Sequence, residues 1–334
     1  MKRVVGLVVV AGLVALAWTY ISDPAAAPPQ ALITSAHSRH AAFLRLQSLF
    51  RSDRAASEWL RLADSTVAEA QATSLPLSVE STFSAVDAAA WRFRVRRGQR
   101  IVTDATFERS PAFIDVVRAG GGLPLASAGR GASHVEYDAR EDSDLVVRVQ
   151  PPLNHPGAYR IVARLEPSLR FPVRGIDPGS VQSSFGGPRD AGRRKHAGID
   201  IFAPRGTPVL AAADGWVTGS TMNGLGGNVV WVWSPLRQMT TYYAHLDRHQ
   251  VAPGDRVRAG DVVGYVGTTG NARGTPPHLH FGVYVWHVGA VDPLPYVRDL
   301  TIRNTHEKRN LRTKTRSRTR SGSPVGTATP TQAP

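Results

Sequence analysis

The spacing of apolar residues changes along the chain, and the first spacing is helical. Between residues 35 and 72, large apolar side chains recur every three to five positions among charged ones, as on an amphipathic helix. The polar pair Ser52-Asp53 interrupts this pattern, so we predict two helices. We expect their apolar face to pack on the next domain; its residues are Phe43, Leu46, Phe50, Trp59, Leu62 and Val67.

After Pro76 the period shortens to that of a half-buried strand. Residues 91–96 read WRFRVR, a strict alternation of apolar and basic side chains. Further strands are expected at 101–107, 113–117, 145–149 and 159–165, between loops rich in Gly, Ser and Pro. Short strands between turn signals predict a β-sandwich. The segment shows no cluster of His and carboxylate residues, so we interpret it as an accessory binding or spacer module.

A second β segment runs from about residue 171 to residue 300 and shows no helical period. Its candidate strands are β-branched or aromatic, and glycine recurs at short intervals between them. These features predict an antiparallel sheet with tight turns. The expected strands are 209–213, 216–220, 228–233, 239–245, 261–266 and 280–286.

The N-terminus has the pattern of an export signal. Lys2 and Arg3 precede an apolar run over residues 4–21. That run fits either a signal peptide or an uncleaved anchor. The small residues 25–27 offer a cleavage site, whereas Pro28 would hinder cleavage. We therefore expect an exported protein of the periplasm or cell envelope, with anchoring to the inner membrane and cleavage both left open.

The positive charge is concentrated at the C-terminus. The net charge is +14, and residues 301–334 contribute eight basic residues against one acidic residue, Glu307. That tail is also rich in Ser, Thr and Pro, so we predict a disordered segment. It would attract polyanions without sequence specificity. Export makes anionic envelope polymers or lipids the expected partners, and no specific nucleic acid.

The chain has no cysteine, so any metal site must use His, Asp or Glu. His196 and Asp200 are four residues apart, roughly 13 Å on an extended strand, which is too far to share one ion. Gly198 between them allows the backbone to bend. Ile199 and Ile201 flank Asp200. An unpaired carboxylate there would be costly to bury, and a cation would compensate it.

His278 and His280 would face the same side of a strand, because side chains two apart share a face. One imidazole can then bind the metal while the other stands beside it. Two His and one Asp leave a tetrahedral zinc ion one open position, which is typical of catalytic sites. His245 ends an alternating stretch and would supply a further imidazole for proton transfer or for stabilising an oxyanion.

Four short motifs carry a family resemblance. They are FGGPR at residues 185–189, HAGID at 196–200, YAHL at 243–246 and HLHF at 278–281. In this order they resemble the M23 peptidases, the lysostaphin-like and LytM-like zinc metalloendopeptidases. The resemblance covers about 130 of the 334 residues.

The resemblance implies a role for each candidate residue. His196, Asp200 and His280 would bind zinc, while His245 and His278 would act on the water and the tetrahedral intermediate. It also implies hydrolysis of peptide bonds in the stem peptides or cross-links of peptidoglycan. The expected domains are a signal peptide or anchor (1–30), a helical segment (31–72), a β-sandwich accessory domain (73–170), an M23-like zinc peptidase domain (171–300) and the basic tail (301–334).

Two other readings were weighed. A catalytically inactive activator of wall hydrolases would have the same fold, but the complete set of ligands argues against it. A biotinyl or lipoyl carrier needs a lysine at its hairpin tip, and residues 197–300 contain none. The sequence leaves open which peptide bond is cut. It also leaves open whether the N-terminal domains cover the groove until a regulatory envelope protein releases it.

Overall fold

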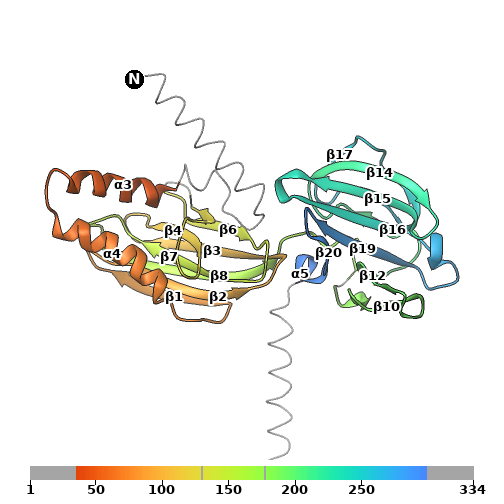
Figure 1. The fold of residues 1–334 in the computed structure, drawn as a ribbon, viewed down its shortest axis with the longest axis horizontal. Helices are drawn as coiled ribbons and strands as arrows, with labels where there is room; N and C mark the ends of the chain where they lie inside the picture. The colour runs from red at the N-terminus through yellow and green to blue at the C-terminus, as the bar shows by residue number, and fades with distance from the viewer. Residues whose placement is uncertain (1–34, 129–130, 177, 299–334) are drawn as a thin grey trace, which may run out of the picture. The chain divides into compact units, whose positions relative to one another are not determined.

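A computed structural model describes residues 35–298, apart from residues 129–130 and residue 177. Over these residues the chain is mainly β, as the sequence predicts (Figure 1). The strands divide into a first module of residues 77–167 and a second module of residues 181–291. The predicted N-terminal segment and basic tail lie outside the described residues. Within the described part, none of the helices has the length and apolar character that crossing a bilayer requires.

Two helices precede the strands and confirm the predicted pair. They are α3 (Ala36–Ser48) and α4 (Arg54–Ala68). Asp53 begins α4, because its Oδ1 accepts hydrogen bonds from the backbone N–H groups of Ala55 at 2.9 Å and Ala56 at 3.1 Å. The polar pair Ser52-Asp53, which predicts a break between two helices, therefore contains the cap of the second helix.

The predicted apolar face of the helices is only partly buried. Trp59 of α4 is fully buried, but Phe43, Leu46 and Phe50 are 54%, 56% and 85% exposed. The expectation that this face packs on the next domain is wrong for α3. Hydrogen bonds of His37 fix the rotation of α3 and turn the opposite side of the helix toward the strands.

The first module is a sandwich of two antiparallel four-stranded sheets, ordered β1-β8-β3-β6 and β2-β7-β4-β5. Both sheets contribute to one apolar core, in which Phe93, Ile101 and Leu145 are nearly inaccessible to solvent. The five predicted strands are present, and three more were not predicted. The bounds are β1 (Leu77–Phe83), β2 (Ala89–Val95), β3 (Gln99–Phe107), β4 (Phe113–Arg118), β5 (Ala126–Ser127), β6 (His134–Asp138), β7 (Ser143–Gln150) and β8 (Gly157–Pro167).

The second module has one large antiparallel sheet with the path β17-β14-β15-β16-β19-β12-β9, to which β13, β18 and β20 also pair, and a separate two-stranded sheet of β10 and β11. Each predicted strand overlaps an observed one, although residues 211–213 lie outside β13. A short helix, α5 (Leu294–Val297), was not predicted. The bounds are β9 (Val181–Ser183), β10 (Pro188–Arg189), β11 (Arg194–Lys195), β12 (Ile199–Phe202), β13 (Pro208–Leu210), β14 (Gly215–Asn223), β15 (Gly227–Ser234), β16 (Met239–His249), β17 (Arg256–Val257), β18 (Val262–Val266), β19 (His278–Val285) and β20 (Gly289–Val291).

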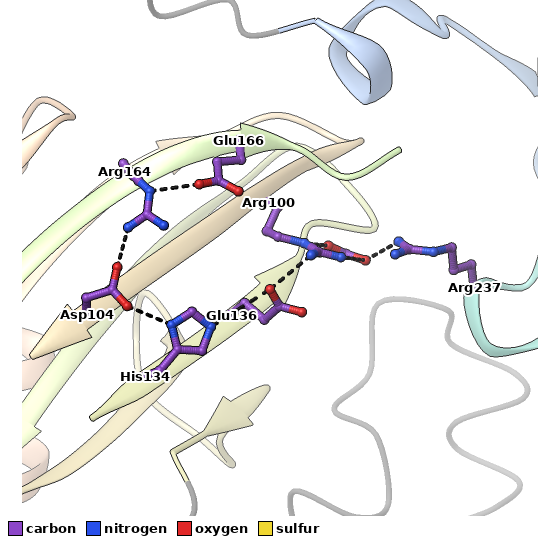
Figure 2. Close-up of polar contacts among 8 residues, drawn as sticks. Arg100, Asp104, His134, Glu136, Arg164, Glu166 and Arg237 are labelled. Atoms are coloured by element: carbon purple, nitrogen blue, oxygen red, sulfur yellow. Dashed lines mark hydrogen bonds and ion pairs between the residues drawn. The ribbon is translucent and has the colours of Figure 1, made fainter. Parts of the chain in front are cut away.

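The solvent face of β3, β6 and β8 carries a charged network (Figure 2). The register of β3 and β6 places Asp104 opposite His134, whose Nδ1 lies 2.7 Å from Oδ1 of Asp104. The prediction that this module lacks clustered His and carboxylate residues is therefore wrong, because strand pairing joins residues distant in sequence. Arg164 contacts Asp104, and Arg100 donates to Glu136 at 2.9 Å. These arginines neutralise the carboxylates, so the cluster is an ion-pair network.

The same network reaches the second module. Asp138 of β6 accepts a hydrogen bond from Nε of Arg100 at 2.6 Å and another from Arg237 (Figure 2). Arg237 belongs to the short turn Pro235–Arg237 between β15 and β16. Nearby, the ring of Tyr296 packs on Gly98, where a Cβ atom would lie 2.4 Å from the ring. Both contacts join a residue of the first module to a residue outside it, and neither involves a histidine motif.

A buried polar network holds α3 and α4 on the sandwich. Nη2 of Arg148 donates to the Asp115 carboxylate and to Nδ1 of His37 at 3.0 Å, and Nη1 donates to the carbonyl of Ala63 at 3.0 Å. His37 Nε2 donates to Oε1 of Gln150 at 2.7 Å, so the imidazole is neutral and its Nδ1 lone pair faces the guanidinium. Burial, followed by the charge of Arg148, lowers the pKa of His37 to about 4.

We therefore expect stability to fall as the pH drops through the ordinary His range. The unfolded chain takes up a proton on His37 near pH 6.5, whereas the folded chain does so only near pH 4. At pH 5 this one group should lower the free energy of unfolding by about 2 kcal/mol relative to neutral pH. Urea unfolding at both pH values should show a larger loss for the parent than for His37→Gln, which cannot titrate. Equal losses would contradict a neutral His37.

Candidate metal centre

Three neighbouring strands position the candidate residues. In the antiparallel register of β12 and β19, Asp200 lies opposite His280. On the other side of β19, Ala244 of β16 lies opposite the same histidine. Directly opposed residues of neighbouring strands project to the same face, so Asp200 and His280 come together on one face of the sheet.

Three donor atoms converge at this point. His196 Nε2 lies 3.0 Å from Asp200 Oδ1 and 2.9 Å from His280 Nδ1, and that Nδ1 lies 3.1 Å from the same carboxylate oxygen. All three residues are buried or nearly so. The sequence predicted this group, and the structure brings it together as a possible metal site.

The bend between His196 and Asp200 is tight, and Gly198 is required there because of space. A Cβ atom at this position would lie 2.4 Å from the carbonyl oxygen of Phe281 and 2.8 Å from Nε2 of His280. The sequence argument assigned Gly198 to backbone freedom, but its φ lies outside the left-handed region. Glycine instead allows the loop carrying His196 to rest directly against β19.

Neighbouring groups orient the donor atoms of His196 and Asp200. His196 Nδ1 lies 2.9 Å from the carbonyl oxygen of Ser184 and 3.1 Å from Nη2 of Arg189. With its proton on Nδ1, the ring donates to the Ser184 carbonyl and presents the Nε2 lone pair. Burial alone would raise the pKa of Asp200, but the interactions with the neighbouring imidazoles of His196 and His280 outweigh it and hold that pKa well below its usual range. Asp200 is therefore a carboxylate.

Arg189 is a residue of this site to which the sequence reasoning gave no role. Its Nη2 donates to Oδ2 of Asp200 at 2.7 Å, which leaves Oδ1 directed at the two histidines. It also contacts the hydroxyl of Ser183. Arg189 ends the FGGPR motif, so the signal was present in the sequence. Only the folded chain shows that this guanidinium holds the carboxylate.

The alternation predicted for the HLHF stretch is present in β19. His278 and His280 border the same cleft, while Leu279 and Phe281 are fully buried in the core on the other face of the sheet. The ring of Phe202 lies against that of His278, with 5.1 Å between the ring centroids. The two histidines of the motif therefore differ in surroundings, and only His280 reaches the carboxylate.

His245 enters the same cleft through a break in strand geometry. Tyr242 and Ala244 line the cleft, as alternation requires, yet the adjacent His245 also lines it. Its φ of 63° is left-handed, a conformation uncommon for residues other than glycine. Its backbone N–H is held by the carbonyl of Gly226 at 2.7 Å. This local distortion redirects the imidazole toward His278, with 5.1 Å between the ring centroids.

Backbone carbonyls hold His278 and His245, the two histidines outside the group of three donors, in one tautomer. His278 Nδ1 donates to the carbonyl of Pro276 at 2.9 Å, and His245 Nδ1 donates to the carbonyl of Thr269 at 3.0 Å. Each therefore keeps the Nε2 lone pair free to accept a proton. Burial, followed by the neighbouring His278 and His280, lowers the pKa of His245 to about 4. This imidazole is a neutral base at physiological pH.

All five predicted site residues border one open cleft of about 390 Å³. Two loops, at residues 222–228 and 268–277, also line it, through Leu225, Gly226, Asn271, Ala272, Thr275 and Pro276. The first loop is a short hairpin end, because β14 and β15 extend to Asn223 and Gly227. In the described part of the chain, every residue that lines the cleft belongs to the second module.

The donor set fits a zinc ion. Ligands about 2.1 Å from a tetrahedral ion lie roughly 3.3 Å from one another, close to the separations of the three donor atoms. Two imidazoles and a carboxylate are ligands that zinc accepts, and three protein ligands leave one coordination position open. The open cleft then gives a substrate access to that position.

Part of the chain matches a known protein family. Residues 194–293 match the model of peptidase family M23. The chain is 48% identical over 88 residues to the DD-carboxypeptidase/endopeptidase Mpg of Neisseria meningitidis, which covers 26% of this chain and 20% of that protein. It is 43% identical over 91 residues to the peptidoglycan DD-endopeptidase ShyC of Vibrio cholerae, with the same two coverages.

The similarity to a solved structure is likewise limited to part of the chain. The catalytic domain of lysostaphin from Staphylococcus simulans is 30% identical and covers 36% of this chain and 93% of that domain, with a TM-score of 0.33. The chain spans about a fifth of the length of the two curated relatives named above. The family match lies within the module that holds the three converging donors. The chain therefore contains a peptidase family M23 domain.

Proposed function

We propose that this protein is a zinc-dependent endopeptidase that hydrolyses peptide bonds in the stem peptides or cross-links of peptidoglycan. The observation that carries the proposal is the convergence of three candidate metal-ligand atoms with two further imidazoles in one open cleft. The relatives whose names state an activity are endopeptidases, and one is named for peptidoglycan.

In this proposal His196, Asp200 and His280 hold the zinc ion. Zinc at such a site lowers the pKa of bound water to about 7 and polarises a carbonyl oxygen. Arg189 fixes the carboxylate through its second oxygen, and the Ser184 carbonyl fixes the ring of His196. Groups that orient metal ligands in this way also raise metal affinity.

His245 and His278 would then move protons. Each presents an Nε2 lone pair while a backbone carbonyl holds its Nδ1–H. A neutral imidazole can accept a proton from the attacking water and later donate one to the leaving amine. Once protonated, it can also stabilise negative charge on the oxygen of the former carbonyl. His245 and His278 would divide proton transfer and charge stabilisation between them.

Peptidoglycan is an envelope polymer, so the proposed substrate places the protein in the cell envelope. This agrees with the basic and apolar pattern of the first 30 residues, which also fits export. The basic tail would add unspecific attraction to anionic envelope polymers or lipids. An inactive activator is the alternative, but a protein without catalysis has no need for both a complete donor set and two oriented bases.

The first prediction separates ligands from bases. Asp200→Ala and His280→Ala should lose zinc and wall hydrolysis together, because each removes a donor atom. His278→Ala should keep zinc and lose roughly 10²- to 10⁴-fold in rate, as expected for a general base or acid. Metal content by mass spectrometry and turbidity loss of cell walls would be measured. Full zinc content in Asp200→Ala would contradict the ligand assignment.

The second prediction concerns Arg189. Arg189→Met should weaken zinc binding by roughly 10- to 100-fold, because Asp200 loses the partner of its second oxygen. Competition with a chromogenic chelator gives the zinc affinity independently of turnover. Arg258→Met, at an exposed position outside the cleft, serves as the control. Equal zinc affinities in the two variants would show that the guanidinium does not support the ligand.

The third prediction concerns the tail. Deletion of residues 301–334 should leave kcat on a small soluble peptide unchanged, because every residue found to line the cleft precedes residue 281. Retention on an anionic polymer should fall, most clearly at low ionic strength where Coulomb attraction is strong. A large loss of kcat would mean that the tail takes part in the catalytic site.

A further inference from the structure

Helix α3 and the two residues after it expose large apolar side chains, of which Phe43 also borders a pocket shared with the sandwich. Phe43 and Leu46 are 54% and 56% exposed, and at the end of the helix Leu49 and Phe50 are 75% and 85% exposed. Isolated exposed apolar residues are common on protein surfaces, but four within eight positions form a contiguous patch. We call these four residues the α3 patch.

The patch lies opposite the buried side of the same helix. At 3.6 residues per turn, Phe43 and Leu46 fall on one side of α3, whereas the buried Ala41 and Leu44 fall on the other. Leu49 caps the helix and Phe50 follows it. Polar contacts of His37 hold this orientation from the buried side. A helix that is apolar on both sides normally has both sides covered. Within the described residues, only the side of α3 that carries Ala41 and Leu44 is buried.

The charge around the patch selects an anionic partner. Residues 24–52 contain no Asp or Glu, whereas Arg39, Arg45 and Arg51 all lie in this stretch and are exposed. Long arginine side chains can lie along an apolar surface while their charged heads reach anionic headgroups. Apolar side chains flanked by arginines are the composition of helices that lie in the interface of a bilayer.

The preceding sequence limits how far α3 can lie from such a surface. The apolar run of residues 4–21 ends 14 positions before the helix cap Ser35. Fully extended, the intervening residues 22–34 span at most on the order of 45 Å. If the apolar run enters a bilayer, α3 is therefore confined near the same surface, where a weak contact suffices for binding.

We propose that the α3 patch docks on an anionic lipid bilayer, with its apolar side chains in the headgroup region and its arginines at the lipid phosphates. Such a contact would hold the sandwich at the membrane through α3 and leave the cleft of the second module, which contains none of these residues, available for substrate. The proposal does not depend on catalysis, so its failure would leave the proposed peptidase activity untouched.

Because the chain lacks cysteine, a single introduced cysteine places a spin label at one chosen site. The full chain carrying Leu49→Cys would be reconstituted into vesicles of phosphatidylcholine and phosphatidylglycerol and labelled with a nitroxide. Ser48→Cys is the matched control, because the adjacent residue is also exposed but points about 100° away around the helix. Relaxation by oxygen, which concentrates in lipid, is compared with relaxation by a water-soluble nickel chelate.

The proposal expects the label at position 49 to be relaxed more by oxygen, and the label at position 48 more by nickel. Nickel access at both positions would overturn it, since the patch would then face water. Low access to both reagents at position 49 would also overturn it, because a protein segment would cover the patch. Dipolar broadening would identify a second copy of the chain as the partner and overturn it equally.

A second variant tests whether the patch itself makes the contact. Phe43→Ser combined with Phe50→Ser, in the Leu49→Cys chain, removes the two aromatic side chains at exposed positions where folding does not require them. We expect the label to become accessible to nickel while hydrolysis of a soluble peptide stays unchanged. A label that remains in lipid would show that other residues hold the helix there, and the proposal would be wrong.

Discussion

The pairing of β12 with β19 is the constraint on which the metal centre depends. Their register places Asp200 opposite His280, and a slip of one residue would send one of the two side chains into the core face of the sheet. The register is secured by burial, because Ile199, Ile201, Leu279 and Phe281 all lie in the apolar core behind the site. Apolar packing behind the sheet therefore fixes the strand register, and the register fixes the positions of Asp200 and His280.

Around this centre, backbone groups do much of the orienting. The carbonyl oxygens of Ser184, Pro276 and Thr269 each accept a hydrogen bond from Nδ1–H of a histidine and so favour the tautomer in which Nε2 is free. Their positions are set by turns and strand ends, which side-chain substitutions elsewhere hardly move. Arg189 is the exception, since a side chain holds the carboxylate. The candidate site is thus oriented mainly by backbone carbonyls, and in addition by one side chain, that of Arg189.

The two modules differ in what covers the faces of their sheets. The second module needs an open cleft on one face of its sheet, and the core on the other face supports it. The first module covers one of its sheets with helices through the buried pair Arg148 and Asp115, while its other sheet carries an exposed ion-pair network. That network extends to Arg237 and, with the packing of Tyr296 on Gly98, ties the modules together. None of these contacts uses a residue of the cleft.

The sequence alone determined the mainly β fold, the two helices and the alternation in HLHF, because periodicity is a local property. Short motifs, which are also local, proposed the five candidate site residues that border one cleft. It did not reveal that His245 needs a left-handed backbone, that Arg189 holds Asp200, or that Asp104 and His134 meet. It also placed Phe43 and Phe50 in a core that they do not enter. These features depend on which strands pair and how a helix is rotated. Contacts between residues distant in sequence decide both, and no local pattern records them.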